Sequence, residues 1–214
     1  MVQEAERPQD GLRERKRRET LQRVAQTGLE LFVAKGYEQT TLDDIAAAAG
    51  ISRRTFFHYF KSKDEILLAW QIGLADSVRA AVLEAGTDQS PLDALCGALL
   101  RLASHYDTDT AIVIAGLLRS SDQLRAANQA KYLQMEHAAF EALCRLWPQR
   151  TRREGLRMTA MIGIGAFRVA VDEWADSGAK EAFTRCIAKT FDNLRKELAT
   201  TPLNNQVPRG RPAK

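Results

Sequence analysis

The sequence predicts an all-α protein of about nine helices, and three observations carry that prediction. No stretch of the 214 residues is rich in Val, Ile and Thr with the alternation of a β-strand. Stretches of helix length, with apolar residues on one side, follow each other along the chain. Short breaks rich in Gly, Pro, Ser and Asp separate them, and these residue types cap or end helices.

The first two helices are predicted from their end signals. The first covers about 13–34 and stops at Gly36, since glycine is the usual residue just after a helix. Thr40 or Thr41 caps a short second helix, because a threonine side chain can accept a hydrogen bond from a free N–H of the first turn. That helix ends at Gly50.

The third and fourth helices begin after serines. Ser52 caps a short helix that reaches Phe60. Ser62 caps the next one, in which Asp64 and Glu65 occupy the first turn, where the helix dipole favours acidic side chains.

Polar breaks divide the rest of the chain into further helices. A long helix ends at Pro148, another covers about 150–175, and the last ends near 198. The tail 201–214 is rich in proline and is expected to be disordered. The breaks lie at 86–90, 107–109, 120–122, 148 and 177–178.

Composition and charge exclude several classes of protein. The longest apolar run, 160–167, is far shorter than the ~20 residues that span a bilayer, and the polar start is no signal peptide. The three cysteines form no Cys-x-x-Cys pair, so we expect no structural metal ion and a cytoplasmic protein with reduced thiols.

The net charge of +4 divides into +3 for 1–63, −2 for 64–200 and +3 for 201–214. An anionic partner should therefore meet the two ends.

The segment 41–60 has the layout of a helix-turn-helix, whose second helix enters the major groove of DNA. At 100° per residue, Phe56 and Phe60 share one side of that helix and can lock it to the helices before it. An amphipathic helix with merely solvated arginines is the alternative, but the caps, the turn and the spacing together favour DNA. The opposite side carries Arg53, Arg54, Phe57 and His58.

Motifs in and around this segment closely resemble the TetR family of transcriptional regulators. The resemblance covers about 13–70, and the family implies an all-helical homodimer that binds a palindromic operator. It implies a disordered arm at 1–12, a DNA-binding domain at 13–62, an effector-binding and dimerisation domain at 63–200, and a tail at 201–214. The motifs are GLELF at 28–32, GY at 36–37, TTLDDIA at 40–46, AGIS at 49–52 and TFFHYFKSK at 55–63.

The resemblance also implies a set of DNA contacts. At the position of Phe57 the family commonly has tyrosine. Because phenylalanine has no hydroxyl to donate to a phosphate, we expect its ring to contact a thymine methyl group instead. At the position of Arg54 it often has glycine, and an arginine there suits O6 and N7 of guanine. The family's contact positions correspond here to Thr41, Ser52, Arg53, Arg54, Phe57, His58, Tyr59 and Lys63.

Two basic segments flank this unit. The first helix starts with five basic residues within 13–18, which could reach phosphates or the adjacent minor groove, or remain solvated. The sequence PRGRP at 208–212 resembles the core of an AT-hook, which lies in an A·T minor groove. A plain disordered basic tail is the favoured alternative.

The effector is harder to predict. By resemblance, apolar helix faces line a pocket, and the expected effector is apolar or aromatic, with an anionic group as an option. The polar side chains expected to orient it are His105, His137 and Arg168, although each also fits an ordinary surface or core position. The apolar candidates, some of them plain core, are Trp70, Tyr106, Trp147, Met158, Met161, Phe167 and Trp174.

The last two helices are expected to form the dimer interface, again by resemblance, unless both pack only on their own subunit. On the first of these helices, a spacing of three to four residues places four residues on one side: Met161, Gly165, Arg168 and Asp172. Small residues at Gly163, Gly165 and Ala166 would let two helices approach closely. The last helix adds Phe183, Ile187, Phe191 and Leu194.

The sequence therefore predicts a ligand-responsive, dimeric DNA-binding regulator and favours a repressor. An effector-independent activator or an architectural DNA-binding protein is the alternative. An enzyme is not expected, because the three histidines are far apart and Gly163-Ile164-Gly165 lacks the third glycine of a dinucleotide site. No cofactor and no membrane partner are expected.

Overall fold

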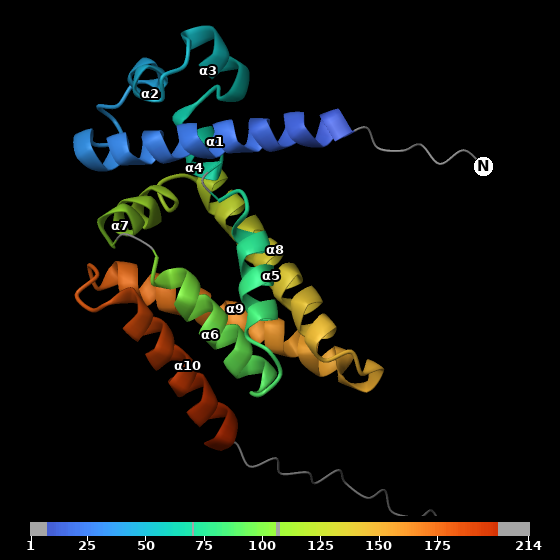
Figure 1. Ribbon diagram of the computed structural model, residues 1–214. Coiled ribbons are helices and arrows are strands. Elements are labelled where there is room, and N and C mark those ends of the chain that lie inside the picture. Colours follow the sequence, from blue (N-terminus) through green and yellow to red (C-terminus); the bar gives the residue numbers. More distant parts are fainter. Residues whose placement is uncertain (1–7, 70, 106–107, 201–214) are drawn as a thin grey trace, which may run out of the picture.

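The structure, a computed structural model, describes residues 8–69, 71–105 and 108–200. Within these ranges the chain is helical, without strands, which confirms the predicted all-α fold. The helices form a smaller body, at the top of Figure 1, and a larger body below it. In chain order they are α1 (Pro8–Lys35), α2 (Leu42–Ala48), α3 (Arg53–Tyr59), α4 (Lys63–Ala69), α5 (Leu74–Glu84), α6 (Pro91–Ala103), α7 (Thr108–Leu117), α8 (Asp122–Leu146), the 3₁₀ turn η1 (Arg150–Arg152), α9 (Arg153–Asp176) and α10 (Phe183–Thr200).

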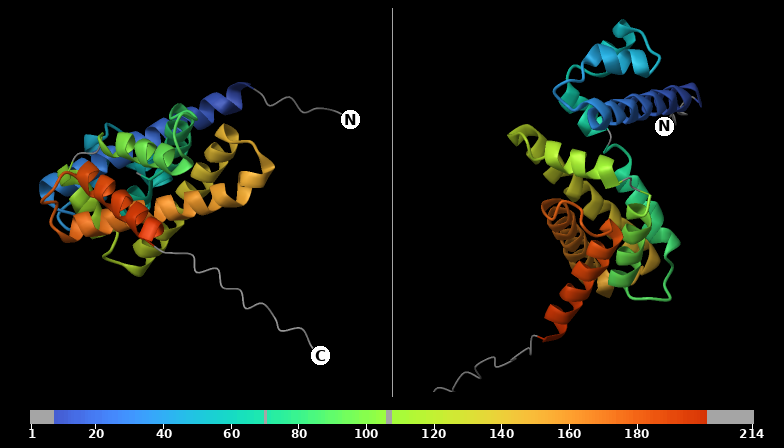
Figure 2. Two further views of the ribbon diagram at one scale, coloured as in Figure 1. Left: turned by 90° about the horizontal axis from the view of Figure 1, so that it is seen from below. Right: turned by 90° about the vertical axis from the view of Figure 1, so that its left-hand side faces the viewer.

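The smaller body packs α1 to α4 around an aromatic and aliphatic core. Phe32 of α1, Ile45 of α2 and Phe56 of α3 are fully buried in it. Gly28 lets α1 and α4 touch, since a Cβ at this position would lie 2.7 Å from Ile66 Cγ2. Because α2 and α3 share this core with α1, both short helices lie on one side of the long helix α1, as the right-hand view of Figure 2 shows.

Glycine turns and hydroxyl caps define the short helices as predicted. Gly36, with φ of 88°, follows α1, and Gly50, with φ of 67°, joins α2 to α3, a backbone region that favours glycine. Thr41, not Thr40, caps α2, because the Asp44 N–H donates to Thr41 Oγ1 at 3.1 Å. The Thr40 hydroxyl instead is buried and donates to the Gly36 carbonyl at 2.8 Å.

The larger body packs α5, α6, α8, α9 and α10 around a second core. α8 lies along α5, while α9 packs against α6, α8 and α10. The contact between α9 and α6 is close, because a Cβ on Gly163 would lie 2.4 Å from Leu95 Cδ2. Fully buried side chains of this core include Val78, Leu95, Leu143, Ile187 and Phe191.

Helix α7 connects the two bodies. Ile114 of α7, Leu118 directly after it and Leu124 of α8 are buried in the core of the smaller body. α7 also packs against α1. α7 is thus in contact with α1 of the smaller body as well as with α9 of the larger body.

The structure differs from the sequence prediction at three boundaries. α1 begins at Pro8 rather than near 13. The stretch 63–84 forms two helices, because the chain turns at Gly73 with φ of 91°, and the described residues hold ten α-helices, in keeping with the predicted number of about nine. Ile66 and Leu67 place α4 in the smaller body, so its packing extends to 69 rather than 62. The tail 201–214 and most of the arm 1–12 lie outside the described residues.

One segment, Lys63–Glu84, is long and apolar enough to cross a membrane by length and composition alone. In the structure its Ile66 and Leu67 lie in one core and its Val78 and Val82 lie in the other. A single such segment, packed in this way, is weak evidence for a membrane protein.

Candidate nucleic-acid interface and internal pocket

The face of α3 that points away from α1 is polar and exposed. Phe56 and Phe60 are 0% and 1% exposed and fasten the other side of the helix to the core. Phe57 is 39% exposed, and its ring meets Phe56 edge-on at 5.6 Å. Arg54 and His58 are exposed beside it. α3 thus has the buried and exposed sides that the 100° periodicity predicts.

The two arginines of this face differ in their surroundings. Arg53 Nε lies 3.2 Å from Asp43 Oδ1, and its guanidinium lies 5.4 Å from the centre of the Phe57 ring. Arg54 has no ion pair or hydrogen bond within the part of the chain that the structure describes. Its five N–H donors are therefore available to a partner outside the protein. Arg54, Phe57 and His58 also line a shallow hollow on this surface.

Thr41 and Ser52 stand at the starts of α2 and α3, where both are exposed. The Thr41 hydroxyl donates to Asp44 Oδ2 at 2.8 Å, and hydrogen bonds from Thr41 hold the pKa of Asp44 below its usual value. Ser52 Oγ accepts from the Thr55 N–H at 3.1 Å and lies 2.7 Å from Thr55 Oγ1. The hydroxyl proton of Thr41 is thus already donated within the protein. In the Ser52–Thr55 pair, one of the two hydroxyl protons bridges the pair, and the other stays available to donate to a phosphate.

Tyr59 and Lys63 lie at the border of the same surface. Tyr59 is half-buried, with its ring 5.4 Å from that of His58. Lys63 Nζ donates to the Tyr37 carbonyl at 2.7 Å and lies 4.3 Å from the centre of the Tyr37 ring. The Tyr37 hydroxyl donates to Asp64 Oδ1 at 2.5 Å, and burial, followed by Asp64, raises the pKa of Tyr37. The Lys63 ammonium is therefore fixed at the edge of the surface with two N–H donors left.

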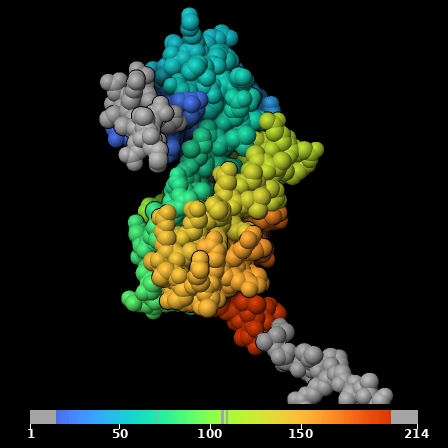
Figure 3. Space-filling view, turned by 90° about the vertical axis from the view of Figure 1, so that its right-hand side faces the viewer, coloured from blue at the N-terminus to red at the C-terminus, as the bar shows by residue number. Residues whose placement is uncertain are grey.

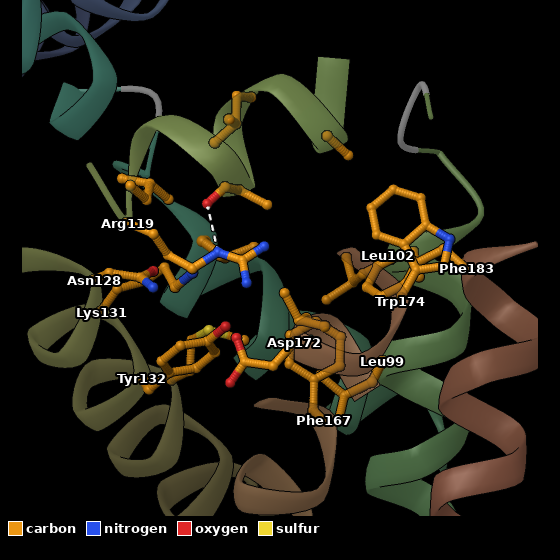
Figure 4. Close-up of a pocket in the computed structure, with 18 residues that line it drawn as sticks. Leu99, Leu102, Arg119, Asn128, Lys131, Tyr132, Phe167, Asp172, Trp174 and Phe183 are labelled. Atoms are coloured by element: carbon orange, nitrogen blue, oxygen red, sulfur yellow. Dashed lines mark hydrogen bonds between the residues drawn. The ribbon is translucent and has the colours of Figure 1, made fainter. Parts of the chain in front are cut away.

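A pocket lies in the larger body between α7, α8 and α9 (Figure 4). It contains about 820 Å³ of space that atoms do not fill, a figure that includes open solvent at its mouth. One wall is aromatic, with the Phe183 ring 4.9 Å from Trp174 and 5.9 Å from Phe167. Aliphatic residues that line the pocket include Leu74, Leu99, Leu102, Ile114, Leu118 and Val171.

Polar side chains line the other side, opposite Trp174 and Phe183 in Figure 4. Asn128 Oδ1 is buried and has no hydrogen-bond partner among the described residues. Lys131 Nζ lies 4.1 Å from the centre of the Tyr132 ring. Burial lowers the pKa of Lys131 to about 8 and raises the pKa of Tyr132. The pocket is thus apolar at one end and polar at the other.

Neither histidine proposed as a ligand residue lines this pocket. His105 is exposed, and its Nδ1 lies 2.8 Å from the Arg101 carbonyl. His137 is exposed, and its Nε2 lies 3.3 Å from Glu141 Oε1. Two further candidates, Trp70 and Tyr106, lie outside the described residues.

The remaining candidates also lie elsewhere. Trp147 is buried at the far end of α8, 5.7 Å from the Arg152 guanidinium. Met161 is 47% exposed on the outside of α9, and the exposed Arg168 donates to Gln129 Oε1 at 2.7 Å. From the wider aromatic set, Phe167 and Trp174 do line the pocket.

The polar residues of α8 that line the pocket are not among the residues predicted from the sequence. Asn128, Lys131, Tyr132 and Met135 are spaced by three, one and three residues, so they share one side of a helix. A lysine on a mostly apolar helix side was the available signal.

The last two helices differ in what they expose. Met158, Met161 and Val169 of α9 are 53%, 47% and 48% exposed, and Gly165 has open space around it. The apolar residues expected to make α10 a dimer surface instead pack within their own subunit, with Ile187 and Phe191 fully buried. Gly163 and Ala166 are also buried within the subunit. In Figure 3, α8 and the start of α9 together form one side of the larger body.

Three sets of known proteins resemble this chain. Residues 25–70 match the family model of bacterial regulatory proteins of the tetR family. The HTH-type transcriptional regulator TcmR of Streptomyces glaucescens is 30% identical over 204 residues, which cover 88% of each chain. The regulator SrpR of Pseudomonas putida is 45% identical over 51 residues, 24% of each chain.

Solved structures share the fold. Thermus thermophilus FadR, a TetR-family repressor in complex with lauroyl-CoA, has a TM-score of 0.57 and 24% identity, covering 91% of this chain and 98% of its own. Bacillus subtilis FadR in complex with stearoyl-CoA also has a TM-score of 0.57, with 20% identity, and covers 80% of this chain and 96% of its own.

Proposed function

The chain belongs to the TetR family of bacterial transcriptional regulators, and from this we propose that it is a cytoplasmic repressor. It binds a palindromic operator as a homodimer and leaves the operator when a small molecule fills the pocket of the larger body. In the alternative role, that of an activator or architectural protein without an effector, the pocket of the larger body would have no function.

The outward face of α3 is the observation that carries the DNA-binding part of this proposal. A major groove admits an α-helix, and arginine pairs with O6 and N7 of guanine. Arg54 is exposed without an internal partner, and Phe57 beside it offers a ring to a thymine methyl group. The Ser52–Thr55 hydroxyl pair and Lys63 supply donors for phosphates at the rim of the same surface.

Dimerisation follows from the need to read two half-sites. Two recognition helices must lie about 34–36 Å apart to meet successive major grooves. The exposed apolar strip of α9, Met158, Met161 and Val169, is the surface that supports this part of the proposal. α9, rather than α10, is therefore the helix that we assign to the interface.

Release by an effector follows from the position of α7. Ile114 and Leu118 line the pocket and are also buried in the core of the smaller body. A ligand that displaces α7 would change the orientation of α1 and hence the spacing of the two α3 helices. The FadR proteins of this fold were solved with lauroyl-CoA and stearoyl-CoA, ligands that carry a long acyl chain, which supports a small-molecule effector here.

Footprinting of the purified full chain on DNA from around its own gene tests the proposal. A regulator protects one or a few palindromic sites, and a set of apolar acids and alcohols should include molecules that release it. Coating of the DNA without sequence preference, or protection that no ligand changes, would favour the alternative role.

A further inference from the structure

We propose that the pocket is built for a ligand with a single acidic group, a carboxylate or an ionised hydroxyl, which pairs with Lys131 at one end of an apolar body. This inference rests on the proposed function, because it takes the pocket to be the effector site. It adds the chemical class of the effector and the residue that selects it.

Lys131 differs from the other charged groups of the pocket in lacking a counter-ion. Arg119 Nη1 lies 2.5 Å from Asp176 Oδ1, and Asp172 Oδ2 lies 4.0 Å from Arg168 Nε. Lys131 forms no ion pair or hydrogen bond within the described ranges: its ammonium lies over the Tyr132 ring, and the Asp172 carboxylate, which is paired with Arg168, attracts it only from beyond ion-pair distance. Among the described residues that line the pocket, Lys131 is therefore the cation without a contacting counter-ion, and Asp172 neutralises it only in part.

Lys131 is half-buried in the wall of the pocket, and an ammonium that has lost part of its water without gaining an ion-pair partner is unfavourable, a cost that a ligand can remove. An ion pair with an oxyanion of the ligand restores the interactions that Lys131 loses on leaving water. Burial lowers the pKa of Lys131 although the Asp172 carboxylate acts in the opposite direction, so the protein compensates this charge only in part. An acidic group should therefore increase the affinity of a ligand for this site more than a neutral group of the same size.

The rest of the lining limits what else the ligand carries. The wall of Phe167, Trp174 and Phe183 accepts an apolar or aromatic body. Asn128 Oδ1, buried without a partner, fits a hydroxyl or N–H next to the acidic group. The Asp172 carboxylate also lines the pocket and repels further negative charge. These groups together favour one acid on an apolar body over a polyanion.

Two pairs of probes that differ only in the acidic group test the proposal: dodecanoate against dodecanol, and naphthoate against naphthalenemethanol. Binding to the full chain is measured by titration calorimetry at pH 7. In at least one pair, the acid should bind about 10–100-fold tighter than the alcohol, as for a charge-assisted hydrogen bond. In Lys131→Met this ratio should fall to about one, with alcohol binding retained, whereas Lys131→Arg keeps the preference.

Lys189→Met is the matched control, since Lys189 is exposed on α10 and does not line the pocket. It should leave both ratios unchanged. Equal binding of acid and alcohol by the wild-type chain, or a preference that survives in Lys131→Met, would overturn the inference and leave the proposed function standing. If no probe binds, both the inference and the proposal that this pocket is the effector site would be overturned. Footprinting would still test, independently, the proposal that the chain binds an operator.

Discussion

The ammonium of Lys131 lies over the ring of Tyr132, 4.1 Å from its centre, in a pocket whose other charged groups have ion-pair partners. Burial lowers the pKa of Lys131 in the folded protein to about 8, whereas an unfolded chain holds the same proton up to a pKa of about 10.4. Between these values the unfolded state binds more protons, so stability rises with pH. Below pH 8 the cost of burying the charge is present in full.

Lys131→Met should therefore stabilise the ligand-free protein at neutral pH. We expect the free energy of unfolding to rise by about 1–3 kcal/mol at pH 7, and the gain to shrink at pH 9.5, where the wild-type lysine is neutral in the folded state. Urea unfolding at the two pH values measures this. An equal gain at both would show that packing, rather than charge, sets the difference.

Two glycines of α9, two residues apart, should respond oppositely to alanine. A Cβ on Gly163 would lie 2.4 Å from Leu95 Cδ2 in a fully buried contact, so Gly163→Ala should cost about 1–3 kcal/mol of stability. Gly165 has open space around it, and Gly165→Ala should gain up to about 1 kcal/mol from helix propensity. Thermal unfolding of both variants at low protein concentration compares them directly. A similar loss in both would contradict the packing of α9 on α6.

The exposed strip of α9 predicts the dimer surface. Val169→Glu places a charge in the strip, while the residue is 48% exposed, so we expect an intact fold but a weaker dimer. Sedimentation velocity at micromolar concentration should show wild-type dimers and a shift toward monomers in the variant. Lys189→Glu on α10 is the control and should remain dimeric. The reverse pattern would assign the interface to α10.

Phe56 and Phe57 are adjacent but should have different roles. Phe56→Ala removes a fully buried ring and should cost about 3–5 kcal/mol of stability. Phe57→Ala removes a ring that is 39% exposed, so stability should fall by less while affinity for the operator falls by about 1 kcal/mol or more. Chemical unfolding and fluorescence anisotropy measure the two effects. Unchanged DNA affinity in Phe57→Ala would remove this ring from the interface.

The sequence predicted the DNA-reading side better than the pocket, for a physical reason. The faces of α3 follow from a local period of 3.6 residues and from local caps, so Phe56 and Arg54 could be assigned to opposite sides. The pocket depends on how α7, α8 and α9 approach each other, which no local pattern encodes. His137 and Lys131 are polar residues of the same helix, but only the packing of α9 and α7 makes Lys131 the pocket residue.

The role of α10 in a dimer stays a prediction for a related reason. The apolar spacing of Ile187 and Phe191 indicates a helix side that must be covered, but it does not indicate whether the same subunit or a partner covers it. In the structure both residues are fully buried in the core of the larger body.

Selection of binding sites from random DNA, with the wild-type chain and with Arg54→Ala, tests the central claim that the outward face of α3 reads DNA. The wild type should select a palindrome with a guanine at one symmetric position of each half-site. Arg54→Ala should lose the preference at that position alone and bind about 1–3 kcal/mol more weakly, while Arg185→Ala on α10 behaves as the wild type. An unchanged selected sequence in Arg54→Ala would contradict the account.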